Sequence, residues 1–328
     1  MKRQLLLGAA LISALAIPLA LGGRASFGAL LQFPAGQLVL MLALVFICSN
    51  LNALRLRLLL AGRAGRLAQS DALGVVLATE FAICATPGGS GGPLVLLGLL
   101  ARRGVRPAQG SAIFAVDQLA DLLFFLLALL AVTLYLLGGA PGINITWLIG
   151  LAGGLAILFL LLGGLLRHFQ PTLRLTGTWL ARLGLSRKRR LGVARRLLHF
   201  RRALIETLRL PRRTLLAVFT LCALHWLLRY SVLYLAVRGL QGQIDWAWTF
   251  LIQMLAMAAG HISVLPGGAG STELTVAALL TPLVGSHRTA AAIIVWRFAT
   301  YHFHLLIGAP AFWLLWRKKT RRQAVRAS

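Results

Sequence analysis

Acidic residues are scarce in this chain of 328 residues, with seven Asp and Glu against 34 Lys and Arg. Cysteines are equally few: Cys48, Cys84 and Cys222 lie inside apolar segments at unrelated spacings. That spacing matches neither a disulfide framework nor a cysteine metal site. The loops also hold almost no acid or histidine from which a catalytic or metal centre could be built. We therefore expect no catalytic residue, no metal and no cofactor.

Apolar residues dominate what is present. They make up 59% of the chain, only 12% is charged, and the mean hydropathy is +0.82. This composition predicts an all-α polytopic membrane protein. In a soluble protein a net charge of +27 would suggest nucleic acid. Here the basic residues lie between apolar segments, so we expect no nucleic acid and instead anionic lipid at a basic cytoplasmic face.

Six apolar segments are long enough to cross a membrane, and together they predict a single transmembrane domain over residues 1–328. They cover about residues 5–21, 36–60, 108–137, 145–166, 215–237 and 289–316. We interpret the first as an uncleaved span, with a cleaved signal peptide as the alternative. Repeat-like halves, 36–166 and 214–316, are joined by the basic segment 167–213. Apolar spacing over residues 191–208 fits a helix on the membrane surface, and a solvated basic loop stays open as the other reading.

A helix-break-helix pattern occurs twice. Residues 84–104 read CATPGGSGGPLVLLGLLARRG, and residues 261–284 read HISVLPGGAGSTELTVAALLTPLV. Proline ends the incoming helix, and the glycines allow a turn without side-chain clashes. The apolar pieces on either side of the first break, 72–86 and 94–101, are too short for a hydrocarbon core of ~30 Å. The pattern therefore predicts two re-entrant helical hairpins, with backbone amides at each break free to bind a phosphate.

The basic residues also predict an orientation. With the N-terminus in the cytoplasm, all but five of the 34 Lys and Arg lie on the cytoplasmic side. The five are Arg24, Arg229, Arg238, Arg288 and Arg297. This bias predicts cytoplasmic N- and C-termini. The first hairpin then enters from the cytoplasm and the second from outside, which makes the two an inverted repeat of the kind found in transporters.

Several charged residues fall inside the expected spans, where each costs roughly 2.5–3.5 kcal/mol on insertion scales. Internal ion pairs are one explanation for any single residue, and a polar pathway is the explanation we adopt for the set. The expected substrate path consists of Glu80, Pro87, Gly88, Gly89, Asp117, Asp121, Arg229, His261, Pro266, Gly267, Gly268, Glu273, Arg297 and Tyr301. We expect Arg297 to draw in an anionic headgroup and Asp117 to restrain it in the empty site. His261 is expected to be a satisfied polar residue rather than a proton relay.

The segments TPGGSGG, ARRG, DQLAD, LPGGAGSTE and NALRLRLLLAG resemble the flippase-like transmembrane domain of lysylphosphatidylglycerol synthases. The resemblance implies a multi-pass protein of the bacterial inner membrane that moves a polar-headgroup lipid between leaflets. Aminoacyl-phospholipids, glycolipids and polyprenyl-linked sugars are all candidates. In those synthases a cytosolic aminoacyl-transferase domain follows. Because this chain stops at Ser328, we expect no such enzyme activity. Membrane lipids are the expected partners, and a homo-oligomer stays open.

Two other functions stay open from the sequence alone. Paired re-entrant hairpins also build pores, so a channel or small-solute carrier is the first alternative. An intramembrane transferase acting on a polyprenyl phosphate is the second. It would need a convergent base or a metal site outside the bilayer, for which the loops offer little.

Overall fold

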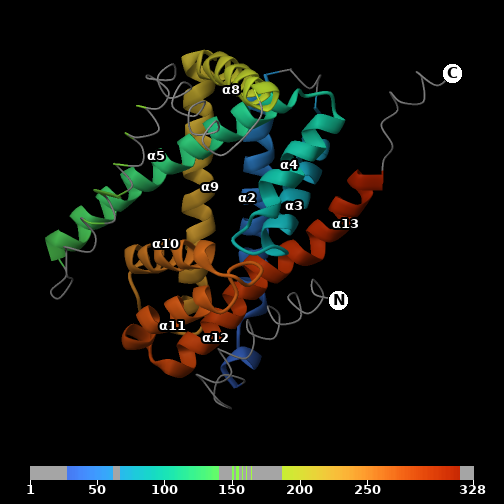
Figure 1. Ribbon diagram of the computed structural model, residues 1–328. Helices are drawn as coiled ribbons and strands as arrows, with labels where there is room; N and C mark the ends of the chain where they lie inside the picture. Colours follow the sequence, from blue (N-terminus) through green and yellow to red (C-terminus); the bar gives the residue numbers. More distant parts are fainter. Residues whose placement is uncertain are drawn as a thin grey trace. The chain divides into compact units, whose positions relative to one another are not determined.

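The computed structural model describes residues 28–61, 67–139 and 187–317, together with six isolated positions between 150 and 164. Its regular elements, within those residues, are all helices (Figure 1). They are α2 (Ala35–Leu60), α3 (Gln69–Cys84), α4 (Gly91–Arg102), α5 (Pro107–Gly139), α8 (Arg187–Leu208), α9 (Arg212–Gly239), α10 (Trp246–Ile262), α11 (Ser271–Val284), α12 (Ser286–Arg297), η1 (Phe298–His302) and α13 (Phe303–Arg317). The expected all-α membrane class is confirmed.

Four stretches of helix are long and apolar enough to cross a membrane. They are α2, the Pro107–Val132 part of α5, α9, and the rod Ser286–Arg317 formed by α12, η1 and α13. These four correspond to expected spans. The other two, 5–21 and 145–166, lie outside the continuously described residues. Each of the helices that flank the two breaks is shorter than a full span, which is the length that the hairpin prediction requires.

The chain divides into two compact units. The first comprises residues 1–57, 66–103 and 224–328, and the second comprises residues 58–65 and 104–223. Both helix-break-helix elements belong to the first unit, while α5 and α8 belong to the second. The division into two repeat-like halves stays a prediction.

The apolar core of the first unit is assembled from five helices. It is formed by residues of α2, α9, α10, α11 and α12, among them Met41, Leu233, Ile252, Leu280 and Ile293. All five of these side chains are at most 2% exposed. This core fixes the second hairpin, α10 and α11, against the long helices.

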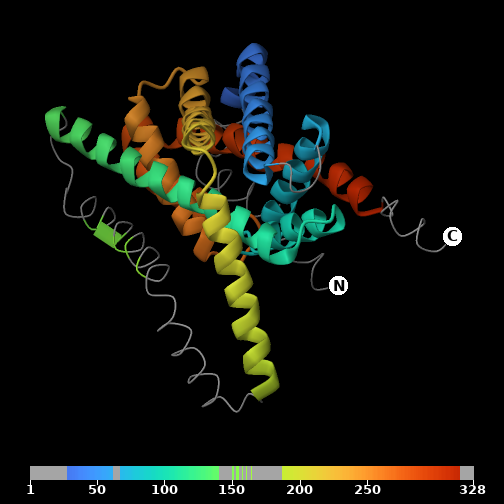
Figure 2. The same cartoon turned by 90° about the horizontal axis from the view of Figure 1, so that it is seen from above.

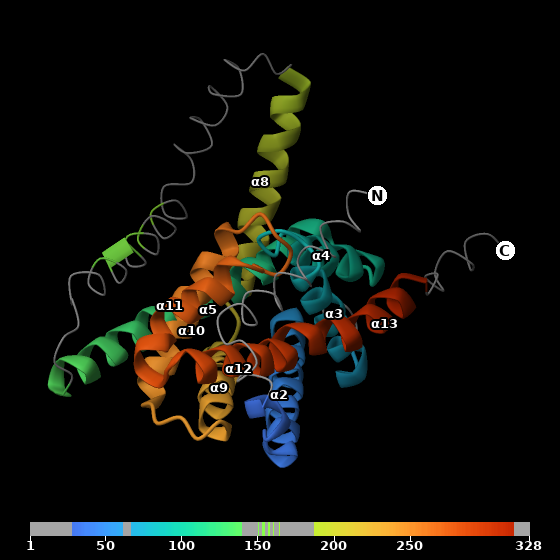
Figure 3. The same ribbon diagram turned by 90° about the horizontal axis from the view of Figure 1, so that it is seen from below.

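The first hairpin is fixed by α13, which packs along α3 (Figure 3). Small residues make the close approach possible, as is usual between membrane helices. A Cβ atom at Gly308 would come 2.7 Å from Cβ of Phe81, and one at Gly74 would come 3.3 Å from Leu315. Phe81 and Phe312 add a ring contact at 5.6 Å between centroids. One long rod therefore contacts both hairpins, because α12 packs against α11.

Helix α9 offers a direct test of orientation. Its 28 residues extend about 42 Å, more than a hydrocarbon core. Arg209 and Gln243 are exposed and flank its two ends. Cysteine placed at Gln243 is expected to react with an impermeant thiol reagent added outside intact cells, and cysteine placed at Arg209 only after permeabilisation. The three native cysteines are buried, so background labelling should be low. Labelling of Arg209→Cys in intact cells would overturn the predicted cytoplasmic side and, with it, the inverted repeat.

Candidate functional site

The two Pro-Gly-Gly breaks touch each other. Pro87 and Pro266 form an isolated antiparallel bridge, and the Gly267 N–H donates to the Thr86 carbonyl at 3.3 Å. The two loops lie side by side in Figure 1. Pro87 and Pro266 are the aligned residues of the two sequence patterns. An antiparallel contact between equivalent positions is what a local two-fold relation between the two hairpins produces.

The aligned glycines share an unusual backbone conformation. Gly88 and Gly267 have φ of +55° and +62°, and Gly89 and Gly268 have φ of +69° and +68°. Side-chain-bearing residues rarely adopt such angles. The first pair also permits close approach of the two hairpins, since a Cβ at Gly88 would lie 2.9 Å from the carbonyl oxygen of His261. The expected need for glycine at these positions is confirmed.

Most backbone amides of the breaks have hydrogen-bond partners, contrary to the expectation that they would be free to bind a phosphate. Every amide from Gly89 to Gly92 donates within the first break, to Thr86 O or Oγ1, Pro87 O or Gly89 O, at 2.8–3.2 Å. The amides from Gly267 to Gly270 are also used, at 2.7–3.3 Å. Most of these donors are already used at the junction, so recognition of an anion there would have to come mainly from side chains.

Arg297 is the central cation of the second break, and its partner is Glu273. Its Nε donates to Glu273 Oε1 at 2.5 Å, and Nη2 donates to the Gly267 carbonyl at 3.3 Å. The other oxygen of Glu273 accepts from the Gly270 N–H at 2.7 Å. Glu273 is fully buried and Arg297 is 5% exposed. The sequence had suggested Asp117 as the carboxylate that restrains Arg297. The ion pair instead ties α12 to the first turn of α11.

Directly after Arg297 the rod contains one π-helical turn, Phe298–His302. Such turns shift the register of backbone hydrogen bonds and are frequent at functional sites. The Thr300 carbonyl within it accepts from His304 Nδ1 at 2.7 Å and from Arg229 Nη2 at 3.3 Å. The π turn thus presents a carbonyl to an arginine of α9.

Arg229 of α9 differs from Arg297 in that none of its partners among the described residues is acidic. It lies within an apolar helix, and its guanidinium contacts Thr300 O at 3.3 Å and His304 Nε2 at 3.5 Å. Neither group carries a negative charge of its own, and no carboxylate of the described residues is paired with Arg229. The side chain is only partly buried. A charged group inside an apolar helix usually faces a partner or a polar cavity, which makes Arg229 a candidate anion-binding residue.

Two further polar groups of the first unit surround this position. The Tyr301 hydroxyl is buried without a hydrogen-bond partner, and the Tyr301 ring lies 5.1 Å from the Arg297 guanidinium carbon. Glu80 is partly buried on α3, the helix that packs along α13. Tyr301, Arg229 and Glu80 are therefore carried by the rod or by helices that contact it, and each has capacity to bind a polar group.

The remaining polar residues of the expected path belong to different units: His261 lies in the first unit, and Asp117 and Asp121 lie in the second. His261 is exposed and its Nδ1 bonds the Met257 carbonyl at 2.7 Å, which agrees with a satisfied polar residue, and its role stays a prediction. Asp117 and Asp121 share α5 and belong to the second unit. Asp121 accepts a hydrogen bond from Cys222 Sγ at 3.1 Å.

Sequence reasoning missed the most informative contacts of the site. It did not anticipate the π turn, for which residues 298–302 carry no compositional signal. It also did not separate Arg229 from Arg297, because both are arginines inside apolar runs and only their three-dimensional neighbours differ. The Gly308 contact with α3 could have been suspected, since glycines in membrane helices often mark close packing.

Comparison with known proteins agrees with this architecture. The family model described as "Lysylphosphatidylglycerol synthase TM region" matches residues 5–308. A UPF0104 membrane protein of Archaeoglobus fulgidus is 22% identical over 262 residues, which cover 78% of this chain and 80% of the relative. An uncharacterized protein of Synechocystis sp. is 34% identical over 121 residues. That match covers 36% of this chain and 37% of the relative, so the alignment spans little more than a third of either protein.

Proposed function

The chain belongs to the lysylphosphatidylglycerol synthase TM-region family. From this premise we propose that it is a flippase that moves a lipid with an anionic headgroup between the leaflets of the membrane. A multi-pass membrane protein with a lipid-related role is the broader expectation for the family. The observation that carries the narrower proposal is Arg229, an arginine inside an apolar helix whose contacts in the structure are to neutral groups.

The position of the breaks supports a pathway at membrane depth. Helices of 12 to 17 residues flank them, which at ~1.5 Å per residue reach roughly 18–26 Å. None of the four spans a core of ~30 Å, so the breaks would lie within it. Irregular backbone at that depth is tolerated when it is buried in protein or lines a polar cavity. Most backbone amides of both loops are hydrogen-bonded within the protein, which fits burial. The neighbouring polar side chains fit a polar cavity.

The chemistry of those side chains fits a phosphate-containing headgroup. Arg229 offers a guanidinium that can bind phosphate oxygens in a bidentate manner. Tyr301 offers a buried hydroxyl that lacks a partner. Glu80 adds a negative charge on the facing helix α3 that could accept an amine of an aminoacylated headgroup. Only the headgroup would enter this region, because the acyl chains can remain in the bilayer beside the apolar outer faces of the helices.

Arg229 gives the proposal a quantitative test. Purified protein in liposomes would be assayed with fluorescent anionic phospholipid, following loss of accessibility to an external quencher. Hydrogen bonds to charged groups contribute about 1.5–3 kcal/mol, so Arg229→Gln is expected to slow flipping roughly 10- to 100-fold. Arg229→Lys, which keeps the charge but not the planar fork, should retain part of the rate. Thermal stability measured beside the rate identifies variants that merely misfold.

Two outcomes would contradict the proposal. Equal flipping by wild type and a stable Arg229→Gln variant would remove Arg229 from the pathway. Leakage of a trapped small solute that exceeds lipid transfer would favour the channel or carrier function instead. A zwitterionic lipid in the same assay reports selectivity, and an aminoacylated lipid tests the contribution of Glu80.

A further inference from the structure

The second unit contains a cavity that the proposed pathway does not use. The C-terminal half of α8 packs against α5 (Figure 2), and the cavity is lined by residues of that half and of the first turns of α5. Ala203, Leu204 and Thr207 are buried at this contact, and their spacing places them on one face of α8. Residues 191–208 are helical, as the first of the two readings requires, and their position at the membrane surface stays a prediction. Beside that contact, α8 and α5 border a cavity of about 790 Å³ that is open to one side.

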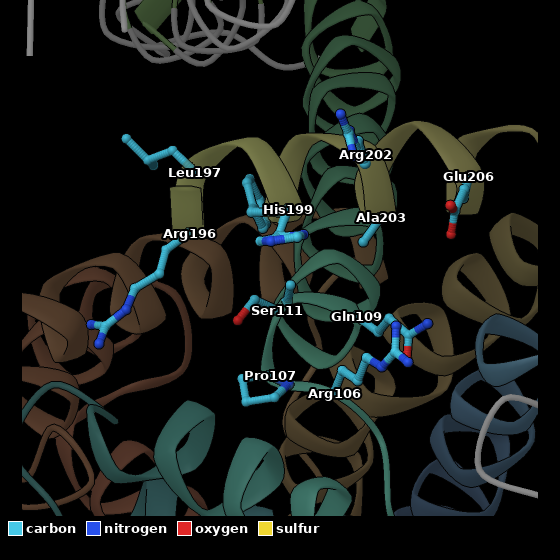
Figure 4. Close-up of a pocket in the computed structure, with 12 residues that line it drawn as sticks. Arg106, Pro107, Gln109, Ser111, Arg196, Leu197, His199, Arg202, Ala203 and Glu206 are labelled. Atoms are coloured by element: carbon cyan, nitrogen blue, oxygen red, sulfur yellow. The ribbon is translucent and has the colours of Figure 1, made fainter. Parts of the chain in front are cut away.

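The cavity is strongly basic. Its charged lining residues are three arginines, Arg106, Arg196 and Arg202, and one acid, Glu206. In Figure 4 the α8 residues lie on one side of the space and the residues from Arg106 to Ser111 on the other. Gln109, Ser111 and His199 add uncharged hydrogen-bonding groups to its lining. A volume within the usual range for ligand sites, about 300–1,000 Å³, and an excess of guanidinium groups together fit a phosphate-bearing ligand.

Apolar residues of the lining indicate the source of that phosphate. Pro107, Leu197, Phe200 and Ala203 form part of the cavity wall. Pro107 is also the first residue of a candidate membrane span, which sets the cavity at the level where hydrocarbon gives way to headgroups. On α8 the exposed Leu191 and Leu198 are seven residues apart and share a face. Basic helices with such a face lie at the membrane surface, and basic pockets at this level take lipid headgroups.

We propose that this cavity between α5 and α8 binds the headgroup of an anionic phospholipid as a resident ligand, separate from the lipid that is transported. The arginines hold the phosphate, the apolar wall contacts the glycerol and the first methylenes, and the acyl chains extend into the bilayer along α5. A lipid bound there would anchor α8 at the membrane surface.

The experiment measures binding of phosphatidylglycerol to the purified full chain in neutral detergent by native mass spectrometry, with phosphatidylcholine as the comparison. Near a membrane surface each Lys or Arg contributes a factor of about five in affinity, so Arg106→Gln and Arg196→Gln should each weaken binding about fivefold and the pair roughly 25-fold. Arg195→Gln is the matched control, because Arg195 is exposed on the same helix and does not line the cavity. Its affinity should equal that of wild type.

Several results would overturn the site. Equal weakening by Arg195→Gln would mean that the surface attracts anionic lipid diffusely. Competition by inorganic phosphate at the same concentration as the lipid would mean that the ligand is a soluble anion. Should the glutamine variants fail to fold, Arg106→Lys and Arg196→Lys keep the charge and are expected to bind normally. The wild-type protein by itself also tests the proposal, because equal binding of phosphatidylglycerol and phosphatidylcholine would refute an anion-binding site.

Discussion

Replacing Arg297 by Met is expected to lower the free energy of unfolding by about 3–5 kcal/mol, the usual cost of leaving one partner of a buried ion pair uncompensated. Glu273 would remain fully buried with its negative charge and keep only the Gly270 N–H of its observed bonds. The loss would be measured as unfolding of the purified protein in mixed micelles. Arg229→Met is the matched control. It removes an arginine that leaves no buried carboxylate behind, so its cost should be clearly smaller.

The double variant Arg297→Met, Glu273→Gln distinguishes a pair effect from lost packing. Gln can still accept from Gly270, and replacing both members of a buried ion pair by neutral groups is often close to neutral for stability. The double variant should therefore recover most of the loss, and costs that simply add would refute the pairing. Lipid transport should also recover, because Arg229 remains. If the double variant is stable but does not transport lipid, Arg297 binds the headgroup, as the sequence first suggested.

Replacing Gly267 by Ala is expected to be the most damaging small substitution in the breaks. A Cβ there would overlap the Tyr301 ring and lie 3.1 Å from the Cys84 carbonyl oxygen, at φ +62°. A left-handed backbone costs a non-glycine residue about 1–2 kcal/mol, and overpacking adds about 1–3 kcal/mol. We therefore expect a loss of roughly 2–5 kcal/mol in the free energy of unfolding together with loss of flipping, because the two hairpins would be pushed apart.

Gly89→Ala separates these two contributions. Gly89 has a comparable φ of +69°, but a Cβ there would approach only the Ile83 side chain, at 3.3 Å. Gly89→Ala should therefore lose only the ~1–2 kcal/mol that a left-handed backbone costs a non-glycine residue. Combining Gly267→Ala with Tyr301→Ala would relieve the overlap with the ring, so the double variant should lose less free energy of unfolding than the sum of the two single losses. Equal losses for Gly267→Ala and Gly89→Ala would show that contact between the hairpins contributes nothing measurable.

Patterns that repeat along the chain were readable without coordinates. The apolar runs predicted the four described spans because a span is a property of consecutive residues. The two Pro-Gly-Gly segments predicted breaks between short helices for the same reason. Even the conformation at Gly88 and Gly267 followed, since glycine next to proline in an apolar run indicates a turn that other residues resist.

Contacts between distant segments were not readable in this way. The sequence placed Arg229 and Arg297 in equivalent settings, each a lone cation in an apolar run. Folding gives Arg297 the buried carboxylate of Glu273 and gives Arg229 only the Thr300 carbonyl and the His304 ring. The choice depends on α11 packing against α12 and on α9 facing the π turn, and no local spacing encodes either contact.

The sequence by itself therefore determined the membrane class, the described spans and the position of both breaks, because hydropathy, helix length and the conformational limits of proline and glycine act locally. Only the tertiary structure decided that Pro87 meets Pro266, that the Gly267 amide is satisfied by the other break, and which of the two arginines is paired with a buried carboxylate. The physical reason is that burying a charge or an amide is favourable only with a partner, and the partners come from helices far apart in the chain.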